Sequence, residues 1–191
     1  MNPYAGDRLS SVLGHTDPSN YIGSVAVINH PFSRGSSHIS SGDPLAHPAL
    51  DPNYFSEEVD IELAVDALLF IQKIFQTSPL AGFIKTSEDG QTKQIQHGFK
   101  LSGSLDRAMV RKLAEDAAMS SWHPIGTCAM LPRDAGGVVD PRLKVYGIEG
   151  LRIVDASVMP LHVRGNIVTS VYAIAERAAD MIKEDLATGA V

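Results

Sequence analysis

The chain has 191 residues, of which 44% are hydrophobic and 20% are charged, a composition typical of a globular protein with a core of its own. The net charge of -6 argues against a nucleic-acid-binding protein, which usually carries a basic face. A single cysteine excludes a disulfide framework within the chain, and no apolar run is long enough to predict a transmembrane helix. The first residues lack the basic start and apolar run of a signal peptide, and the sequence leaves the compartment open.

The first part of the chain predicts short strands and loops. Residues 1–21 are rich in Pro, Gly, Ser, Asn and Asp and predict an irregular lead-in. Residues 24–30 have the β-branched, apolar character of a strand, and a second short strand is expected at 37–41. Three prolines within 42–56 predict an ordered loop.

Two helices follow. Apolar residues recur at three- and four-residue steps over 60–76, where Asp60 is the expected N-terminal cap. A second helix is expected over 105–118, with Ser104 as its cap, and the polar segment 85–100 suits a hairpin or a surface excursion. The apolar stripe of the first helix consists of Ile61, Val65, Leu68, Ile71 and Phe75.

The character of the sequence changes after this point. Residues 120–132 form a loop dense in special residues, followed by short strand candidates at 138–140 and 143–146 and a buried strand candidate at 151–154. A third helix is expected to begin near Asn166 and to run to about residue 186. Its apolar stripe consists of Ile167, Val171, Ile174, Ala178 and Met181.

His123 is the candidate general base. A histidine followed directly by Pro124 lies on a stiff, extended backbone, and Gly126 permits a sharp turn or a close approach to a ligand. Imidazole exchanges protons near neutral pH, which suits acid–base work. The alternative is a histidine that only satisfies loop backbone groups. A zinc site built from His123 and Cys128 lacks further ligands.

The start of the third helix is the second candidate site. Asp155 closes an apolar strand, and Gly165 and Asn166 open the helix. A helix N-terminus presents unpaired N–H groups and a partial positive charge, which favour an anionic ligand atom. The alternative is an ordinary capped helix after a long loop.

Three segments taken together, HPIGTCAM, GGVVDPRLKVYGIEGLRIVDASVMP and GNIVTSVYAIAERAADMI, resemble the C-terminal region of the glucose-methanol-choline (GMC) oxidoreductases in order and spacing. The earlier HPFSRGSSHISSGDP and HPALDPNYF resemble the substrate-domain segment of that family. The resemblance extends over residues 22–186.

The resemblance implies an α+β fold in three parts. After the lead-in at 1–21, residues 22–119 would belong to an antiparallel-sheet substrate domain backed by helices. Residues 120–191 would form the C-terminal strand and helix part of an FAD-binding domain, including the catalytic loop.

The resemblance also implies a reaction, which is FAD-dependent oxidation of a small-molecule alcohol by hydride transfer to flavin N5. Oxygen or another molecule would be the electron acceptor. His123 would be the base, and Asn166 would bind the substrate oxygen beside the flavin. Asp155, Ala156, Asn166 and Ile167 would contact the FAD, and no metal is implied.

The motif G-x-G-x-x-G, which cradles the FAD pyrophosphate in this family, is absent from the sequence. We therefore expect the chain to be a C-terminal portion of an enzyme whose N-terminal FAD-domain half is a missing partner. The alternative is a truncated, non-catalytic GMC-like protein that acts as a binding module. The sequence distinguishes neither the alcohol nor oxidase from dehydrogenase.

Overall fold

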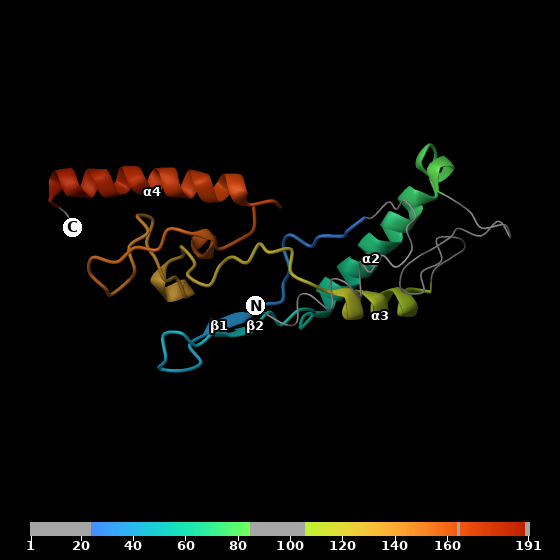
Figure 1. Cartoon of the computed structure of the whole chain (residues 1–191), viewed down its shortest axis with the longest axis horizontal. Helices are drawn as coiled ribbons and strands as arrows, with labels where there is room; N and C mark the ends of the chain where they lie inside the picture. The colour runs from blue at the N-terminus through green and yellow to red at the C-terminus, as the bar shows by residue number, and fades with distance from the viewer. Residues whose placement is uncertain (1–23, 85–105, 164, 190–191) are drawn as a thin grey trace. The chain divides into compact units, whose positions relative to one another are not determined.

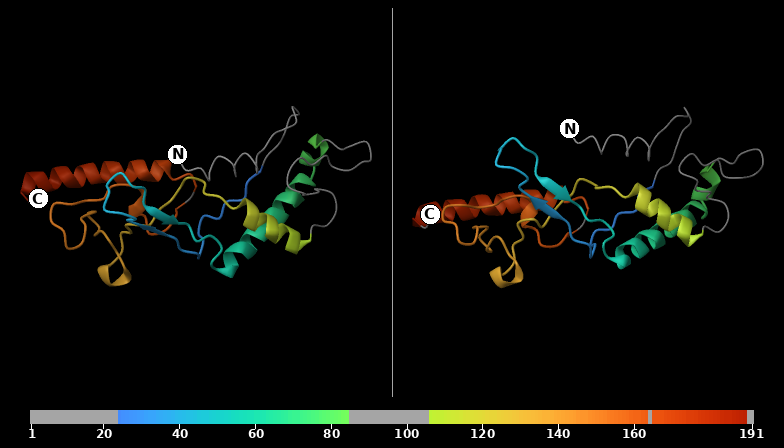
Figure 2. Two further views of the ribbon diagram at one scale, coloured as in Figure 1. Left: turned by 60° about the horizontal axis from the view of Figure 1, so that its bottom comes forward. Right: turned by 90° about the horizontal axis from the view of Figure 1, so that it is seen from below.

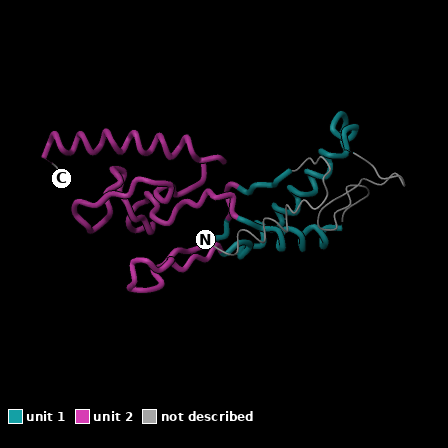
Figure 3. Tube along the Cα trace, viewed as in Figure 1, with its two compact units in different colours: residues 1–28, 32–34, 53–119 teal, residues 29–31, 35–52, 120–191 magenta. Residues whose placement is uncertain are grey.

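The computed structural model describes residues 24–84, 106–163 and 165–189 (Figure 1). These residues group into two compact units, which Figure 3 colours separately. The first contains the described parts of residues 1–28, 32–34 and 53–119, and the second those of 29–31, 35–52 and 120–191. The predicted lead-in at 1–21 and the predicted excursion at 85–100 lie outside the described residues.

The first unit is built on two helices, α2 (Glu58–Phe75) and α3 (Arg107–Ala117), with a 3-10 turn η1 (Leu80–Phe83) after α2 (Figure 2). Both expected helices are confirmed to within a few residues. The two helices pack together through an apolar cluster, to which the expected stripe of α2 contributes. The buried members of this cluster are Ile61, Ala64, Val65, Val110 and Ala114.

Asp60 does not cap α2, contrary to the sequence prediction. Glu57 occupies the cap position, and Asp60 lies inside the first turn with only 1% of its surface exposed. Its Oδ1 accepts a hydrogen bond from the Phe32 N–H (2.8 Å), and its Oδ2 accepts from the N–H (2.7 Å) and the hydroxyl (2.5 Å) of Ser33. The hydroxyl of Ser33 in turn accepts from the Glu57 N–H at 3.1 Å. A distant segment therefore binds both the Asp60 carboxylate and the backbone N–H of the cap residue Glu57.

Helix α3 is capped by Asp106, whose carboxylate accepts a hydrogen bond from the Ala108 N–H at 3.1 Å. The predicted cap, Ser104, lies outside the described residues.

The predicted strand at 24–30 is wrong, because the structure has only irregular backbone there. A strand forms where its N–H and C=O groups meet those of a neighbouring strand, and the described residues place none beside this segment. Val25 and Val27 are 76% and 55% exposed, whereas Ile28 packs against the apolar cluster of α2 and α3.

The second unit contains a β-hairpin in which β1 (Ser36–His38) pairs antiparallel with β2 (Ala49–Asp51) (Figure 2). Ser36 lies opposite Asp51. The strand expected at 37–41 is therefore present, beginning one residue earlier and ending at 38. The expectation of a loop throughout 42–56 is wrong, since β2 lies inside it.

Helix α4 (Val168–Thr188) confirms the predicted third helix. The core of the second unit is formed where α4 packs against the preceding loops. The short strands expected at 138–140, 143–146 and 151–154 are reduced to isolated bridges. The last of them is not buried, because Leu151 and Val154 are exposed. The buried residues of this core are Val139, Leu143, Val158 and Ala178, the last from the expected stripe of α4.

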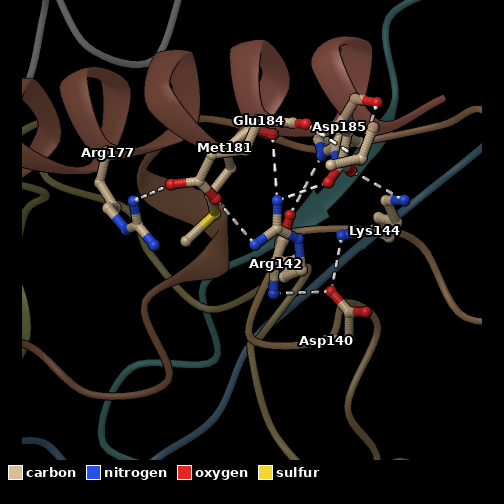
Figure 4. A network of polar contacts seen from close by, with 9 residues as sticks. Asp140, Arg142, Lys144, Arg177, Met181, Glu184 and Asp185 are labelled. Atoms are coloured by element: carbon tan, nitrogen blue, oxygen red, sulfur yellow. Dashed lines mark hydrogen bonds and ion pairs between the residues drawn. The ribbon is translucent and has the colours of Figure 1, made fainter. Parts of the chain in front are cut away.

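A cluster of charges fixes the C-terminal end of α4 to the preceding loops (Figure 4). The buried Asp185 accepts from Arg142 (2.5 Å), Lys144 (2.9 Å) and Arg152. The hydrogen bond from Lys144 lowers the pKa of Asp185, burial opposes this, and the two arginines add to it, so that the pKa falls to about 2. These ion pairs hold residues 142–152 against the C-terminal end of α4.

Helices and an antiparallel hairpin make the described residues an α+β fold. Over the same residues, no helix combines the length and the apolar character that spanning a membrane requires.

Candidate active site

The second unit brings together the two residues predicted to be catalytic. The Nε2 of His123 lies 2.6 Å from the Oδ1 of Asn166, although 43 positions separate them in the chain. His123 is half-buried, whereas Asn166 is exposed and lies two residues before α4 begins. The contact therefore joins the catalytic-loop candidate to the helix-start candidate.

The side-chain amide of Asn166 suits a histidine that changes its protonation state. With its oxygen facing the ring, the amide accepts a hydrogen bond from Nε2 when His123 carries a proton there. Rotation of the amide by 180° would present an N–H donor to an unprotonated Nε2 instead. A carboxylate at the same position could only accept.

A glycine turn and backbone hydrogen bonds constrain the loop around His123. Gly126 has a φ of +85°, in the left-handed region that favours glycine. Beyond it, the N–H of Cys128 donates to the Ser157 carbonyl at 3.0 Å, and a further backbone hydrogen bond follows at Met130. The loop is thereby tied to the turn after residue 154.

His162 is a member of the site that the sequence reasoning missed. Its Nε2 lies 3.1 Å from the backbone carbonyl oxygen of His123, and the two rings meet edge to face with their centroids 6.4 Å apart. The backbone carbonyl of His162 in turn accepts from the Nε2 of His30 at 2.5 Å. Neither His30 nor His162 has the sequence spacing of a metal ligand, and neither belongs to a motif that predicts a catalytic role. The position of His162 four residues before Asn166, on the same segment, was the available signal.

The predicted FAD contacts divide between two places. Asp155 caps a 3-10 turn, η3 (Ala156–Val158), by accepting from the Ser157 N–H at 2.7 Å. Ile167 is buried and occupies the cap position of α4, where no side chain accepts from the first N–H groups and the first turn contains no acidic residue. The first turn of α4 thus adds no negative charge of its own to the positive end of the helix dipole. Among the described residues, no hydrogen bond links Asp155 or Ala156 to the His123–Asn166 contact.

In the described part of the chain, no group of three or more His, Cys, Asp or Glu side chains is placed to hold a metal ion.

Comparison with known proteins identifies the class of protein. The family model described as GMC oxidoreductase matches residues 31–175. This chain belongs to the GMC oxidoreductase family, as its motifs predicted.

Particular relatives agree with this assignment. The GMC oxidoreductase family protein Mala s 12 of Malassezia sympodialis is 43% identical over 157 residues, which are 82% of this chain and 24% of that protein. The dehydrogenase citC of Monascus ruber is 38% identical over 167 residues, covering 87% of this chain and 25% of the relative. The chain thus spans about a quarter of the length of these curated relatives.

Solved structures share the fold. A fungal aryl-alcohol oxidase superposes with a TM-score of 0.66 and 35% identity, over 83% of this chain and 24% of the oxidase chain. A formate oxidase superposes with a TM-score of 0.67 and 32% identity, over 81% and 26% respectively.

Proposed function

We propose that this chain carries the residues that handle the proton in an FAD-dependent oxidation of an alcohol, with His123 as the base and Asn166 as its partner. The observation that carries the proposal is the 2.6 Å contact between His123 Nε2 and Asn166 Oδ1. Membership of the GMC oxidoreductase family supports the reaction class. Relatives named glucose oxidase and aryl-alcohol oxidase favour an organic hydroxyl compound as the substrate. Relatives named oxidase favour oxygen as the electron acceptor, and those named dehydrogenase favour another acceptor.

The start of α4 fits a flavin. Its first N–H groups have no side-chain acceptor, and such groups stabilise negative charge. Asn166 and Ile167 would hold the flavin ring there, and Asp155 with Ala156 would hold the nucleotide side. Bound FAD would supply the acceptor for the hydride that leaves the substrate carbon.

His123 and Asn166 would act on the substrate hydroxyl together. His123 would take the hydroxyl proton at Nε2 as the hydride leaves the substrate carbon, and the hydroxyl oxygen of the alcohol would become the carbonyl oxygen of the product. The NH₂ group of Asn166 would donate a hydrogen bond to the substrate oxygen, and its Oδ1 would accept one from Nε2–H of the imidazolium. The fixed loop keeps the reacting atoms aligned.

The finer domain assignment is part of the proposal. Residues 22–119 would correspond to the substrate-domain part, and residues 120–191 to the C-terminal part of the FAD-binding domain. The complete enzyme would add the dinucleotide-binding half, which contains the G-x-G-x-x-G motif that this sequence lacks.

The test is flavin reduction by alcohol in the FAD-loaded enzyme without oxygen, followed by stopped-flow absorbance. We expect His123→Ala to slow the reduction by about 10²–10⁴-fold, the range typical of a lost general base, with the FAD content unchanged. His47→Ala, at an exposed histidine, is the matched control. Reduction at the wild-type rate in His123→Ala would exclude the base assignment. A protein that takes up no FAD even with the dinucleotide-binding half would favour a binding module.

A further inference from the structure

We propose that His162 is a positioning residue that holds His123 in line with Asn166, acting through the backbone carbonyl of His123. This inference rests on the proposed function of His123 as a base. The hydrogen bond of His162 is made to the backbone of His123, not to its reacting nitrogen.

The geometry of the three side chains supports this role. The hydrogen bond from His162 Nε2 (3.1 Å) fixes the carbonyl of the peptide that carries His123, and the contact with Asn166 (2.6 Å) fixes the far end of the same side chain. His123 is therefore held both at its backbone carbonyl and at its Nε2. Because His162 and Asn166 lie four residues apart on one segment, movement of that segment would displace both anchors together.

The second nitrogen of His162 argues that the imidazole contributes its donor to the contact with His123 rather than stability. A carbonyl oxygen only accepts, so Nε2 must carry the proton, which leaves Nδ1 with a lone pair in the neutral ring. That Nδ1 is buried and has no hydrogen-bond partner among the described residues. A buried polar atom without a partner costs stability, which an apolar side chain of similar size would avoid. The hydrogen-bond donor at Nε2 therefore best explains why an imidazole, rather than an apolar side chain, occupies position 162.

His162 is itself held by the segment before β1. His30 Nε2 donates to the His162 carbonyl at 2.5 Å. A Cβ added at Gly165 would lie 3.3 Å from the Oδ1 of Asn29, which shows how closely this segment approaches the start of α4. The segment at 29–30 thus supports the backbone of His162 and belongs to the same unit.

Two substitutions at position 162 separate the donor from the bulk of the ring. We expect His162→Leu to slow flavin reduction at saturating alcohol by about tenfold, the effect of a small misalignment, with FAD content and substrate KM unchanged. His162→Gln keeps an N–H donor at about the same reach and should restore the rate to within about threefold. His47→Leu is the control at an exposed histidine. Equal rates in the Leu and Gln variants would overturn the proposal.

A double-mutant cycle tests whether His162 acts through His123. In the His123→Ala background, His162→Leu should cause no further loss, because the residue that it positions is gone. A full additional loss there would overturn the positioning role. A wild-type rate in His123→Ala alone would refute the proposed base, whereas a slow His123→Ala with a normal His162→Leu would refute only the positioning role.

A measurement that does not depend on turnover is the ¹⁵N NMR spectrum of the histidine rings. His162 should show the tautomer protonated at Nε2, and His162→Leu should shift the ring signals of His123. The tautomer protonated at Nδ1 would contradict the hydrogen bond on which the inference rests.

Discussion

Replacement of Asp60 by Asn removes one charge and one acceptor at the most deeply buried polar group of the first unit. If the amide oxygen takes the place of Oδ2, it keeps both hydrogen bonds from Ser33, but the NH₂ group then faces the N–H of Phe32. One part-buried donor is left without an acceptor, which costs about 1 kcal/mol, and two charge-assisted bonds become neutral, at about 1 kcal/mol each. The expected total is about 3 kcal/mol of unfolding free energy.

Two assays check this magnitude. Urea unfolding followed by circular dichroism should show the loss for Asp60→Asn, while Asp66→Asn, an exposed carboxylate on the same helix, should cost less than about 1 kcal/mol. Trypsin should also cut faster after Arg34, because Asp60 holds the adjacent Ser33. Unchanged stability together with unchanged cleavage after Arg34 would refute the reasoning.

The pH dependence gives an independent check on Asp60. Burial raises the pKa of this carboxyl, but the hydrogen bonds from Ser33 and Phe32 outweigh burial and bring the pKa below its ordinary value. The stabilisation that the charge provides is therefore complete above the ordinary pKa of 3.8 and is lost as the pH falls through the lower folded value. The difference between wild type and Asp60→Asn should shrink below about pH 4.

Two further variants address the second unit. Gly137→Ala should destabilise by about 3 kcal/mol, because its Cβ would lie 1.8 Å from the carbonyl oxygen of Leu131; Gly42→Ala, with open space around it, should leave the melting temperature unchanged, and equal melting temperatures for the two variants would contradict the close approach. The pKa of Asp185 is lowered to about 2, so its stabilising charge is present above the ordinary value of 3.8 and is lost on acidification towards pH 2. Asp185→Asn should remove that part of the acid transition, and an identical acid transition in the variant would exclude this role for Asp185.

The sequence alone determined the helices of this protein and the chemistry that its motifs predict. The repeat of apolar residues at three- and four-residue steps is a local property, and it predicts α2 and α4. This works because the backbone hydrogen bonds of a helix join residues four positions apart in the same segment. His123 and Asn166 were selected from the order of the motifs, which does not depend on the distance between them in space.

The tertiary structure decided those features in which a residue contacts a partner far along the chain. The apolar run at 24–30 could not predict its own pairing, since a strand depends on a neighbour that the local pattern does not contain. Asp60 has the residue type of a cap, but its carboxylate instead accepts hydrogen bonds from Ser33 and Phe32, which lie far from it in the sequence. His162 looked like one histidine among several, and only folding placed its Nε2 against the carbonyl of His123. Period and capping are encoded within a few residues, whereas these contacts exist only after distant segments meet.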